Sequence, residues 1–534
     1  MLDRSVILPH ALAARAAAAP DREFLFDLTS GRTFTWSGMH RETLRWAAAF
    51  SRLGVGAGDH VVTMLPGDST ATMSWIGLSW LRAVEVPLNT AYKGPMLQYI
   101  VDNSDAAVAV VAQRFIDRFA DIAAELPQIR TIVVPDASGE LPALPCAVVR
   151  GEDFFAGVEP LGDPAGPDFH DIACIIYTSG TTGPSKGVLV PWGQFYMHAT
   201  FPTAWSGEAW EVDDPAYYVL APQFHVGGKT GVYICALYGA RLILREQFSL
   251  NEFWNDVRKY RITYAGLLGP MPSFLLSLPP RPDDAQTTLK YCSSAPLLPT
   301  ITQFAERFGV RVSTGYGMTE VGAPLAHGFD LPNLQSCGRA RTDVAGIEVR
   351  VVDEHDYPVP PNTVGELLVR TREPWFLNVG YYKMPEATAT AWRNGWFHTG
   401  DAFRYDEDGN FYFVDRIKDA IRRRGENISS FEVEAYVLRY PPVAEAAAVA
   451  VPSEHTEDEV KVFVVPKPDQ EFTPEGLIRF LIPIMPRFMI PRYVEVVPAL
   501  PKTPTLRVKK GELRGGGPGP AAWDREAAGI EIPK

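Results

Sequence analysis

The sequence predicts an α/β protein with layered sheets in a large N-terminal part, a small β subdomain and a compact α+β C-terminal domain. Three observations lead to this prediction. Up to about residue 340, short apolar segments typical of strands alternate with helical segments. From 346 to 370, two strand patterns are joined by a proline-rich turn at 358–361. After Asp415, a basic run is followed by alternating helix and strand patterns.

The strands of the N-terminal part are predicted from short runs of apolar and β-branched residues. Several of these runs end directly in loops rich in glycine, serine, threonine or proline. Open α/β sheets bind ligands at the carboxyl ends of their strands, so these loops are the expected location of a binding site. The expected strands are 61–65, 107–111, 172–177, 217–221, 264–268, 289–293 and 310–314.

Composition and charge narrow the class of protein. The chain has 534 residues, of which 46% are hydrophobic and 21% charged, as is usual for globular proteins of several domains. The net charge of −13 gives no reason to expect nucleic-acid binding. Five scattered cysteines predict neither a zinc site nor a disulfide framework. The alanine-rich segment 11–20 suggests a surface helix, no apolar run is long enough to span a bilayer, and a cytoplasmic location is expected.

The strongest motif is the loop at 177–187, where an apolar strand runs into small polar residues and one lysine. Backbone N–H groups and hydroxyls in such a loop can surround phosphate oxygens, and glycine allows the backbone a close approach. The spacing does not match the Walker pattern, which argues against a nucleotide triphosphatase of that class. The candidate phosphate ligands are Thr178, Ser179, Gly180, Thr181, Thr182 and Lys186.

This loop resembles the phosphate loop of adenylate-forming enzymes, and the acyl-CoA synthetase branch in particular. Ser185 stands where the family usually has proline, and the other family segments follow in order along nearly the whole chain. The resemblance implies an N-terminal adenylate-forming domain at 1–416 that includes a small β-barrel subdomain at about 340–416. It also implies a small mobile α+β lid domain at 417–534 that binds AMP, and we expect a flexible tail from 515.

Taken alone, His225 could be an ordinary buried histidine and Glu320 a surface carboxylate; their occurrence together in one order favours the functional interpretation. The segment 222–228 resembles the family's acyl-site segment and makes His225 an aromatic gate. We expect Gly227, Gly228 and Gly322 to leave space for a bulky hydrophobic acid. An amino-acid substrate is disfavoured because no aspartate follows the gate to pair with an amine.

The resemblance assigns the nucleotide site to the segments that follow the expected strands 289–293 and 310–314, and to residues just before the C-terminal domain. Tyr316 would stack on adenine, Thr319 would contact the α-phosphate or the carboxylate, and Glu320 would hold Mg²⁺. Asp401 and Arg416 would bind the ribose. The other residues assigned to the nucleotide are Ser294, Ala295, Pro296, Gly315, Gly317, Met318 and Phe413.

The C-terminal domain of related enzymes swings between two half-reactions, and the resemblance gives its parts here. Lys418 would be the hinge, and Gly425 would let the thiol arm of coenzyme A pass through a tunnel. Arg422 and Arg424 would assist coenzyme A or AMP. The expected cofactors are ATP or AMP, coenzyme A and Mg²⁺, and the expected substrate is a carboxylic acid or its adenylate.

One departure from the family pattern concerns the first half-reaction. The family's catalytic lysine lies in a segment of the form P-x-T-x-[ST]-G-K, but this chain has Leu506 and Arg507 in place of the glycine and lysine. The planar guanidinium is not equivalent to a compact ammonium. We therefore favour a ligase that forms the thioester from acyl-AMP but adenylates weakly or not at all, with a separate adenylating enzyme as a possible partner. The alternatives are a complete synthetase using Arg507 or Lys509 and an inactive nucleotide-binding paralogue.

Overall fold

The computed structural model describes most of the chain. The described residues are 3–178, 185–200, 207–269, 271–295, 297, 300–329, 333–341, 346–416, 421–423, 426–453, 458–503, 507–514 and 517–532. Eight residues with predicted roles lie outside these ranges, namely Ser179, Gly180, Thr181, Thr182, Pro296, Lys418, Arg424 and Gly425. The side chain of Arg422 also lies outside the described part of the structure.

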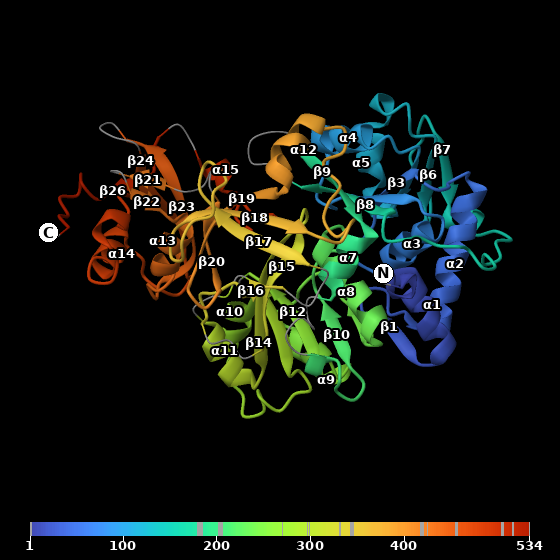
Figure 1. Cartoon of the computed structure of the whole chain (residues 1–534), viewed down its shortest axis with the longest axis horizontal. Coiled ribbons are helices and arrows are strands. Elements are labelled where there is room, and N and C mark those ends of the chain that lie inside the picture. Colours follow the sequence, from blue (N-terminus) through green and yellow to red (C-terminus); the bar gives the residue numbers. More distant parts are fainter. Residues whose placement is uncertain are drawn as a thin grey trace.

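Two large sheets form the N-terminal part of the molecule (Figure 1). The first has seven strands in the order β7-β6-β5-β3-β4-β8-β9, all parallel except for the antiparallel pair β8 and β9. Its strands are β3 (His60–Met64), β4 (Val84–Pro87), β5 (Val108–Val111), β6 (Thr131–Val134), β7 (Ala147–Arg150), β8 (Ile172–Thr178) and β9 (Lys186–Pro191).

The second sheet has nine strands in the order β16-β15-β14-β13-β12-β10-β11-β1-β2. Its central strands from β1 to β14 are parallel, and antiparallel strands β2 and β15–β16 extend the two edges. The strands are β1 (Glu23–Asp27), β2 (Thr33–Thr35), β10 (Ala216–Val219), β11 (Arg241–Leu244), β12 (Tyr264–Leu268), β13 (Tyr291–Ala295), β14 (Arg311–Met318), β15 (Gly322–His327) and β16 (Arg339–Ala340).

Helices pack against both sheets and between them. Asp68 caps α3, because its carboxylate accepts hydrogen bonds from the amides of Thr70 and Ala71. The helices are α1 (Leu8–Ala18), α2 (Trp36–Arg52), α3 (Ser69–Trp80), α4 (Gly94–Asn103), α5 (Ile116–Ala120), α6 (Gly151–Phe154), α7 (Trp192–Ala199), α8 (Val226–Tyr238), α9 (Phe253–Lys259), α10 (Met271–Leu276), α11 (Ile301–Phe308), α12 (Pro385–Ala391), α13 (Ser430–Val437), α14 (Pro474–Leu481) and α15 (Lys510–Leu513).

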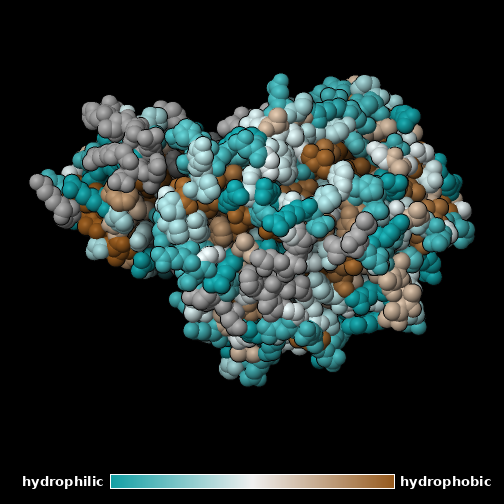
Figure 2. Space-filling model, viewed as in Figure 1, coloured by the Kyte–Doolittle hydropathy of each residue, from teal (hydrophilic) through white to brown (hydrophobic). Residues whose placement is uncertain are grey.

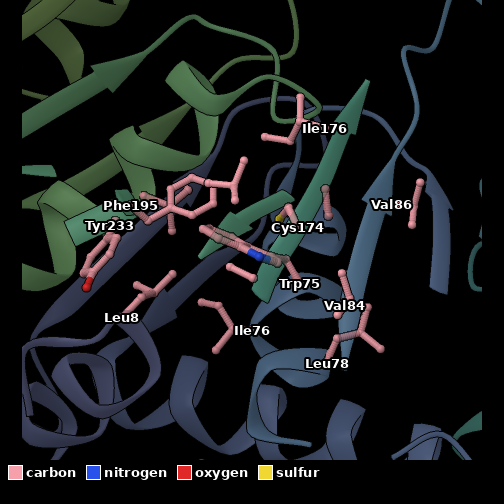
Figure 3. Packing of buried hydrophobic residues seen from close by; sticks show 14 of the residues in the cluster. Leu8, Trp75, Ile76, Leu78, Val84, Val86, Cys174, Ile176, Phe195 and Tyr233 are labelled. Carbon is pink, nitrogen blue, oxygen red and sulfur yellow. The ribbon is translucent and has the colours of Figure 1, made fainter. Parts of the chain in front are cut away.

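The main hydrophobic core joins the two sheets. Figure 3 shows Trp75 of α3, Cys174 of β8, Phe195 of α7 and Tyr233 of α8 packed together, with Leu8 of α1 at one side. Almost every residue of α3 is buried, as expected of a helix that is apolar or small on all faces. The helix predicted at the N-terminus is therefore more than a surface element, since α1 buries Leu8 and its neighbours against this core.

A buried ion pair crosses the same core. Lys229 of α8 contacts the carboxylate of Glu85 on β4, and the two side chains are only 1% and 2% exposed. The Thr63 hydroxyl donates a 2.7 Å hydrogen bond to the same carboxylate, and the Lys229 ammonium lies 4.3 Å from the centroid of the Trp75 ring. A charge buried at this depth needs such partners because desolvation is costly.

The predicted β subdomain is an antiparallel sheet of four strands in the order β17-β18-β19-β20. Its strands are β17 (Ile347–Val352), β18 (Gly365–Thr371), β19 (Phe397–Tyr405) and β20 (Phe411–Arg416). Within the described residues, the outer strands β17 and β20 do not pair with each other, so the sheet is open where we expected a barrel. The sheet lies between the N-terminal sheets and the C-terminal domain (Figure 1).

The C-terminal domain has its own sheet and its own hydrophobic cluster. Its strands are β21 (Ile421–Arg423), β22 (Glu426–Ile428), β23 (Val443–Pro452), β24 (Asp458–Pro466), β25 (Tyr493–Val496) and β26 (Trp523–Asp524). Within the segment predicted as a tail, β26 pairs with β25, and Arg525 beside it is buried. The free edge of the sheet accepts this additional short strand.

No helix in the described part of the chain is long and apolar enough to cross a bilayer. Figure 2 shows hydrophilic residues over most of the visible face, with hydrophobic residues in separate small areas.

Candidate functional site

Residues from two distant parts of the chain meet where β14 approaches the β subdomain. Tyr316 near the end of β14 donates a 2.5 Å hydrogen bond from its hydroxyl to Oδ2 of Asp401 on β19. Arg416 is the register partner of Asp401 across β19 and β20, and its Nε lies 3.0 Å from Oδ1. Asp401 is only 2% exposed, so a buried carboxylate is held between a phenol and a guanidinium.

The Asp401 carboxylate and its buried surroundings change the pKa of Tyr316. Burial and the negative charge of Asp401 raise the pKa of Tyr316 well above its ordinary value. Tyr316 therefore stays a hydrogen-bond donor at neutral pH. Its ring packs edge-on against Phe403 with a centroid distance of 4.8 Å, and Phe413 packs edge-on against Phe403 at 5.5 Å. The structure thus brings together three of the predicted nucleotide residues, Tyr316, Asp401 and Arg416, with Phe413 close by.

Glu320 lies in the middle of the short loop between β14 and β15. It is buried, and burial raises the pKa of its carboxyl group. The Tyr381 hydroxyl donates a 3.3 Å hydrogen bond to Oε1, and the Asn378 amide donates to the backbone oxygen at 2.6 Å. The Lys186 ammonium lies 4.8 Å from the centroid of the Tyr381 ring, so Tyr381 connects the predicted metal ligand with the lysine of the predicted phosphate loop.

Sequence reasoning missed Tyr381, Asn378 and one further residue. The side-chain amide of Gln194 on α7 donates a 2.6 Å hydrogen bond to the backbone oxygen of Thr319. These three residues donate hydrogen bonds to Thr319 or Glu320, although none of them belongs to a predicted functional motif. In the sequence, each of these residues is marked only as a polar residue among apolar ones. That pattern suggests a buried hydrogen bond but does not show which residue forms it.

His225 occupies the N-cap position of α8, with the extended backbone usual there (φ −106°, ψ 153°). Burial and the positive charge of Arg507 lower the pKa of His225 to about 4, so the ring is neutral at pH 7. Among the described residues, no group hydrogen-bonds to its buried Nε2. A neutral histidine with an unused ring nitrogen is compatible with the predicted gate.

Arg507 reaches the same site from the C-terminal domain. The Arg507 backbone N–H donates a 3.1 Å hydrogen bond to the Thr503 hydroxyl, and the Thr503 N–H donates a 2.7 Å hydrogen bond to the Arg507 carbonyl oxygen. Its side chain is exposed to water, yet enough protein surrounds it that desolvation lowers the pKa of the guanidinium. The positive charge of Arg416 lowers the pKa of the Arg507 guanidinium further, while the carboxylates of Asp401 and Glu320 raise it.

The neighbouring lysines point to other partners. Lys509 Nζ lies 2.8 Å from Oε1 of Glu512 on the surface. Lys510 Nζ lies 2.7 Å from Oε1 of Glu434 and also contacts the Ser430 hydroxyl. Of the three cations, Arg507 alone is electrostatically coupled to the site among the interactions of the described residues. The geometry therefore gives no support to Lys509 as a substitute for the family lysine.

Two of the three glycines that we expected to leave room for the acyl group are explained by packing. A Cβ on Gly228 would lie 2.3 Å from the backbone oxygen of Pro222, so no other residue fits. A Cβ on Gly227 would meet only Ala221, at an ordinary 3.9 Å. Gly322 has φ +62°, and a Cβ there would lie 2.6 Å from the Met197 methyl group. Close packing at Gly228 and Gly322 is thus no evidence for a large acyl pocket.

The remaining predicted residues lie at the ends of neighbouring strands. Ser294 and Ala295 end β13, and within the described residues the buried Ser294 hydroxyl has no hydrogen-bond partner. A Cβ on Gly317 would lie 2.5 Å from the oxygen of Gly322, so β14 and β15 approach closely here. The Tyr316 hydroxyl also lies 3.5 Å from the sulfur of Met318. The carboxyl ends of β13 and β14 thus carry the candidate site, as expected of an open α/β sheet.

The described residues contain no group of three or more His, Cys, Asp or Glu side chains arranged to hold a metal ion. Glu320 by itself fits Mg²⁺, which is usually bound by one or two carboxylates together with phosphate oxygens of a substrate. Its carboxylate has a weak protein partner in Tyr381, and so a ligand position is available.

Comparisons with known proteins agree with this geometry. The family model described as "AMP-binding enzyme" matches residues 12–382, and the model "AMP-binding enzyme C-terminal domain" matches residues 432–506. A crotonobetaine/carnitine–CoA ligase of Escherichia coli O8 is 30% identical over 498 residues, covering 90% of this chain and 93% of the relative.

Solved structures share the fold at lower sequence identity. The anthranilate CoA ligase AuaEII, in complex with anthranoyl-AMP, superposes with a TM-score of 0.85 at 24% identity, covering 96% of this chain and 97% of that one. The o-succinylbenzoate CoA synthetase MenE of Bacillus subtilis, in complex with its acyl-adenylate, has a TM-score of 0.80 at 21% identity, covering 95% and 98%. These likenesses confirm the predicted fold class of layered α/β sheets with a small C-terminal domain.

Proposed function

The chain belongs to the AMP-binding enzyme family, and we propose that it is an acyl-CoA ligase that works through an acyl-adenylate. The observation that carries the proposal is the arrangement around Asp401. A buried carboxylate held by Tyr316 and Arg416 lies in the same site as Glu320, His225 and the Arg507 side chain. The ligase names of its relatives support the same reaction class.

In the first half-reaction, a carboxylate oxygen of the acid attacks the α-phosphorus of ATP, and the bond to pyrophosphate breaks. Asp401 and Arg416 would bind the ribose, Tyr316 would stack on adenine, and Thr319 would contact the reacting oxygens. Mg²⁺, held by Glu320, would supply positive charge at the phosphates. Negative charge grows on the phosphate oxygens in the transition state, and Arg507 would stabilise it.

In the second half-reaction, the sulfur of coenzyme A attacks the acyl carbon of the acyl-adenylate. The bond to the AMP oxygen breaks, the thiol proton passes to solvent, and acyl-CoA and AMP leave. We propose that residues 417–534 act as a lid over the domain at 1–416, that the lid turns at Lys418 between the two steps, and that Gly425 lies in the tunnel for the thiol arm. His225 would act as the gate of the acyl site.

We propose further that adenylation is the weaker of the two steps. Arg507 keeps the positive charge and is coupled to the site, which supports a direct role in adenylation. A guanidinium is planar and larger than an ammonium, so it fits a tight phosphate site less well. The complete synthetase that uses Arg507 is the second candidate, and it is favoured by the same coupling. Nothing in the comparisons supports a separate adenylating enzyme, and we do not propose one.

The test is ATP–pyrophosphate exchange beside a thioester assay supplied with synthetic acyl-adenylate and coenzyme A. Fast thioester formation together with slow exchange supports the proposal. Fast exchange that depends on the carboxylate identifies a complete synthetase. A protein that binds AMP but is inactive in both assays is the inactive paralogue, and the proposed function is then wrong.

A further inference from the structure

The turn that carries His225 is joined to α3 by a buried side chain. The His225 backbone N–H donates a 3.0 Å hydrogen bond to the Pro222 carbonyl oxygen, so residues 222–225 form a hydrogen-bonded turn between β10 and α8. Within this turn, Phe224 and His225 keep part of their surface exposed, whereas Gln223 is only 4% exposed. A glutamine buried in a loop needs hydrogen-bond partners for both ends of its amide.

The Gln223 amide finds these partners in the first turn of α3. The Thr72 hydroxyl donates a 2.9 Å hydrogen bond to Oε1, and Nε2 donates a 3.0 Å hydrogen bond to the backbone oxygen of Asp68. Methionine has about the size of glutamine but can make neither bond, and an ionised glutamate would turn an acceptor toward the Asp68 oxygen. The two bonds together require a side-chain amide, which supplies one acceptor and one donor.

The end of α3 that Gln223 contacts is itself tied to the nine-stranded sheet. The Asp27 carboxylate on β1 accepts two hydrogen bonds from Ser69 at the start of α3, one from the backbone N–H at 3.1 Å and one from the hydroxyl at 2.8 Å. Asp27 and Ser69 are almost fully buried. A turn bonded to this end of α3 is therefore fixed relative to β1 as well as to its own helix, α8.

The His225 ring depends on this turn for its position. Among the described residues, no group hydrogen-bonds to its buried Nε2, and the ring packs against Phe224 with a centroid distance of 4.7 Å. Phe224 belongs to the same turn, so this contact moves with the turn and does not fix it. The place of the ring therefore follows from where the backbone of the turn is held, and the two bonds of Gln223 hold it against α3.

We propose that Gln223 is a positioning residue, which holds the turn 222–225 against α3 and so places the His225 ring at the acyl site. This inference rests on the proposed function, in which His225 is the gate of that site. The family resemblance gives roles in this segment to His225, Gly227 and Gly228, but none to Gln223. Loss of the two bonds is expected to shift the turn and to weaken binding of the acyl group, while the nucleotide residues on β14, β19 and β20 keep their places.

The experiment measures KM and kcat for an acyl substrate by formation of acyl-CoA, and the dissociation constant of AMP by calorimetry. The substrate is the acid that the parent protein converts fastest among butanoate, octanoate, benzoate and anthranilate, or its synthetic adenylate where adenylation is slow. Gln223→Met is expected to raise KM about tenfold, with a smaller change in kcat, and to leave AMP binding unchanged. Gln223→Glu should raise KM at least as much, because it loses the donor to the Asp68 oxygen.

Further variants separate positioning from packing. If Gln223 acts through His225, Gln223→Met should raise KM much less in a His225→Ala background than in the parent protein. Thr72→Val removes one of the two bonds from the other side and should raise KM about threefold, and it tests the contact even if Gln223→Met does not fold. The control is Thr43→Val, which removes a buried hydroxyl that accepts a hydrogen bond from Trp80 at the far end of α3 and should leave KM unchanged.

Each outcome bears on one of the two proposals. An unchanged KM in Gln223→Met, or an equal rise with and without His225, overturns the positioning role and leaves the ligase intact. Weaker AMP binding in Gln223→Met has the same meaning, because it shows general damage to the domain. If the parent protein forms no acyl-CoA from the four acids or from their adenylates, the proposed function itself fails, and the inference about Gln223 fails with it.

Discussion

The Tyr316 hydroxyl lies 2.5 Å from Oδ2 of Asp401, although the two residues are 85 positions apart in the sequence. This contact joins the end of a strand in the nine-stranded sheet to the β subdomain. Arg416 completes the group from the next strand of that subdomain. The nucleotide site that we propose thus depends on how two separate sheets meet.

The first prediction concerns AMP binding. Asp401→Ala removes the charged acceptor for the ribose hydroxyls and is expected to weaken AMP binding by about 1.5–3 kcal/mol. Tyr316→Phe keeps the ring for stacking and loses only its hydroxyl, so its effect should be about 1 kcal/mol or less. Isothermal titration calorimetry measures both. Unchanged AMP affinity in Asp401→Ala would overturn the ribose assignment.

The second prediction concerns Arg507. Replacing Leu506 and Arg507 together by glycine and lysine is expected to raise pyrophosphate exchange at least about tenfold, which corresponds to 1.36 kcal/mol of transition-state stabilisation. Thioester formation from acyl-adenylate should change little, because the adenylate is already activated. Lys509→Ala is the control, since Lys509 pairs with Glu512 on the surface and should not affect exchange. A fall in exchange in the Gly-Lys variant would show that Arg507 suits the site better.

The third prediction concerns the thiol tunnel. Gly425→Leu is expected to block the approach of the thiol, so that thioester formation from acyl-adenylate falls strongly while pyrophosphate exchange continues. Stopped-flow or chromatographic detection of acyl-CoA measures the first, and isotope exchange measures the second. A variant that forms thioester at the parent rate would mean that the tunnel lies elsewhere.

The fourth prediction concerns the buried pair of Lys229 and Glu85. Lys229→Met leaves a carboxylate buried without its counter-charge and is expected to destabilise the protein by about 3–5 kcal/mol. The double variant Lys229→Met with Glu85→Gln should recover much of this loss. Denaturant unfolding followed by tryptophan fluorescence measures both. The control is Lys383→Met, whose pair with Asp105 is largely exposed, and its effect should be about 1 kcal/mol or less.

The fifth prediction is a loss of stability in mild acid. The pKa values of His198 and His225 are about 4 in the folded protein, against an ordinary 6.5. Above pH 6.5 both histidines are neutral in both states and contribute nothing. As the pH falls from 6.5 toward 4, the unfolded chain takes up protons that the folded protein does not, so the unfolding free energy decreases.

Urea unfolding at pH 7, 5.5 and 4.5 tests this fifth prediction. The double variant with His198→Phe and His225→Phe should lose less stability over this range than the parent protein. An equal loss in both proteins would mean that other groups cause the acid sensitivity.

The sequence by itself determined the fold class and the order of the motifs. Strands such as β12 could be predicted from apolar runs, because the alternation of strand and helix is a local property. Tyr316, Asp401 and Glu320 could be assigned because their residue types and order match a family pattern. The reason for a glycine at 228 could not be predicted from the sequence. It is the close approach of the Pro222 backbone oxygen, which results from tertiary packing.

Only the tertiary structure decided which side chains meet. It placed Arg507 where its charge lowers the pKa of His225, while Lys509 pairs with Glu512 on the surface. The sequence does not show which of these two nearby cations faces the site. The tertiary structure also brought Tyr381 to Glu320 and placed His198 beside Gly322. Local sequence patterns fix helices and strands, but contacts between distant segments depend on how whole sheets and domains pack, and no local pattern encodes that packing.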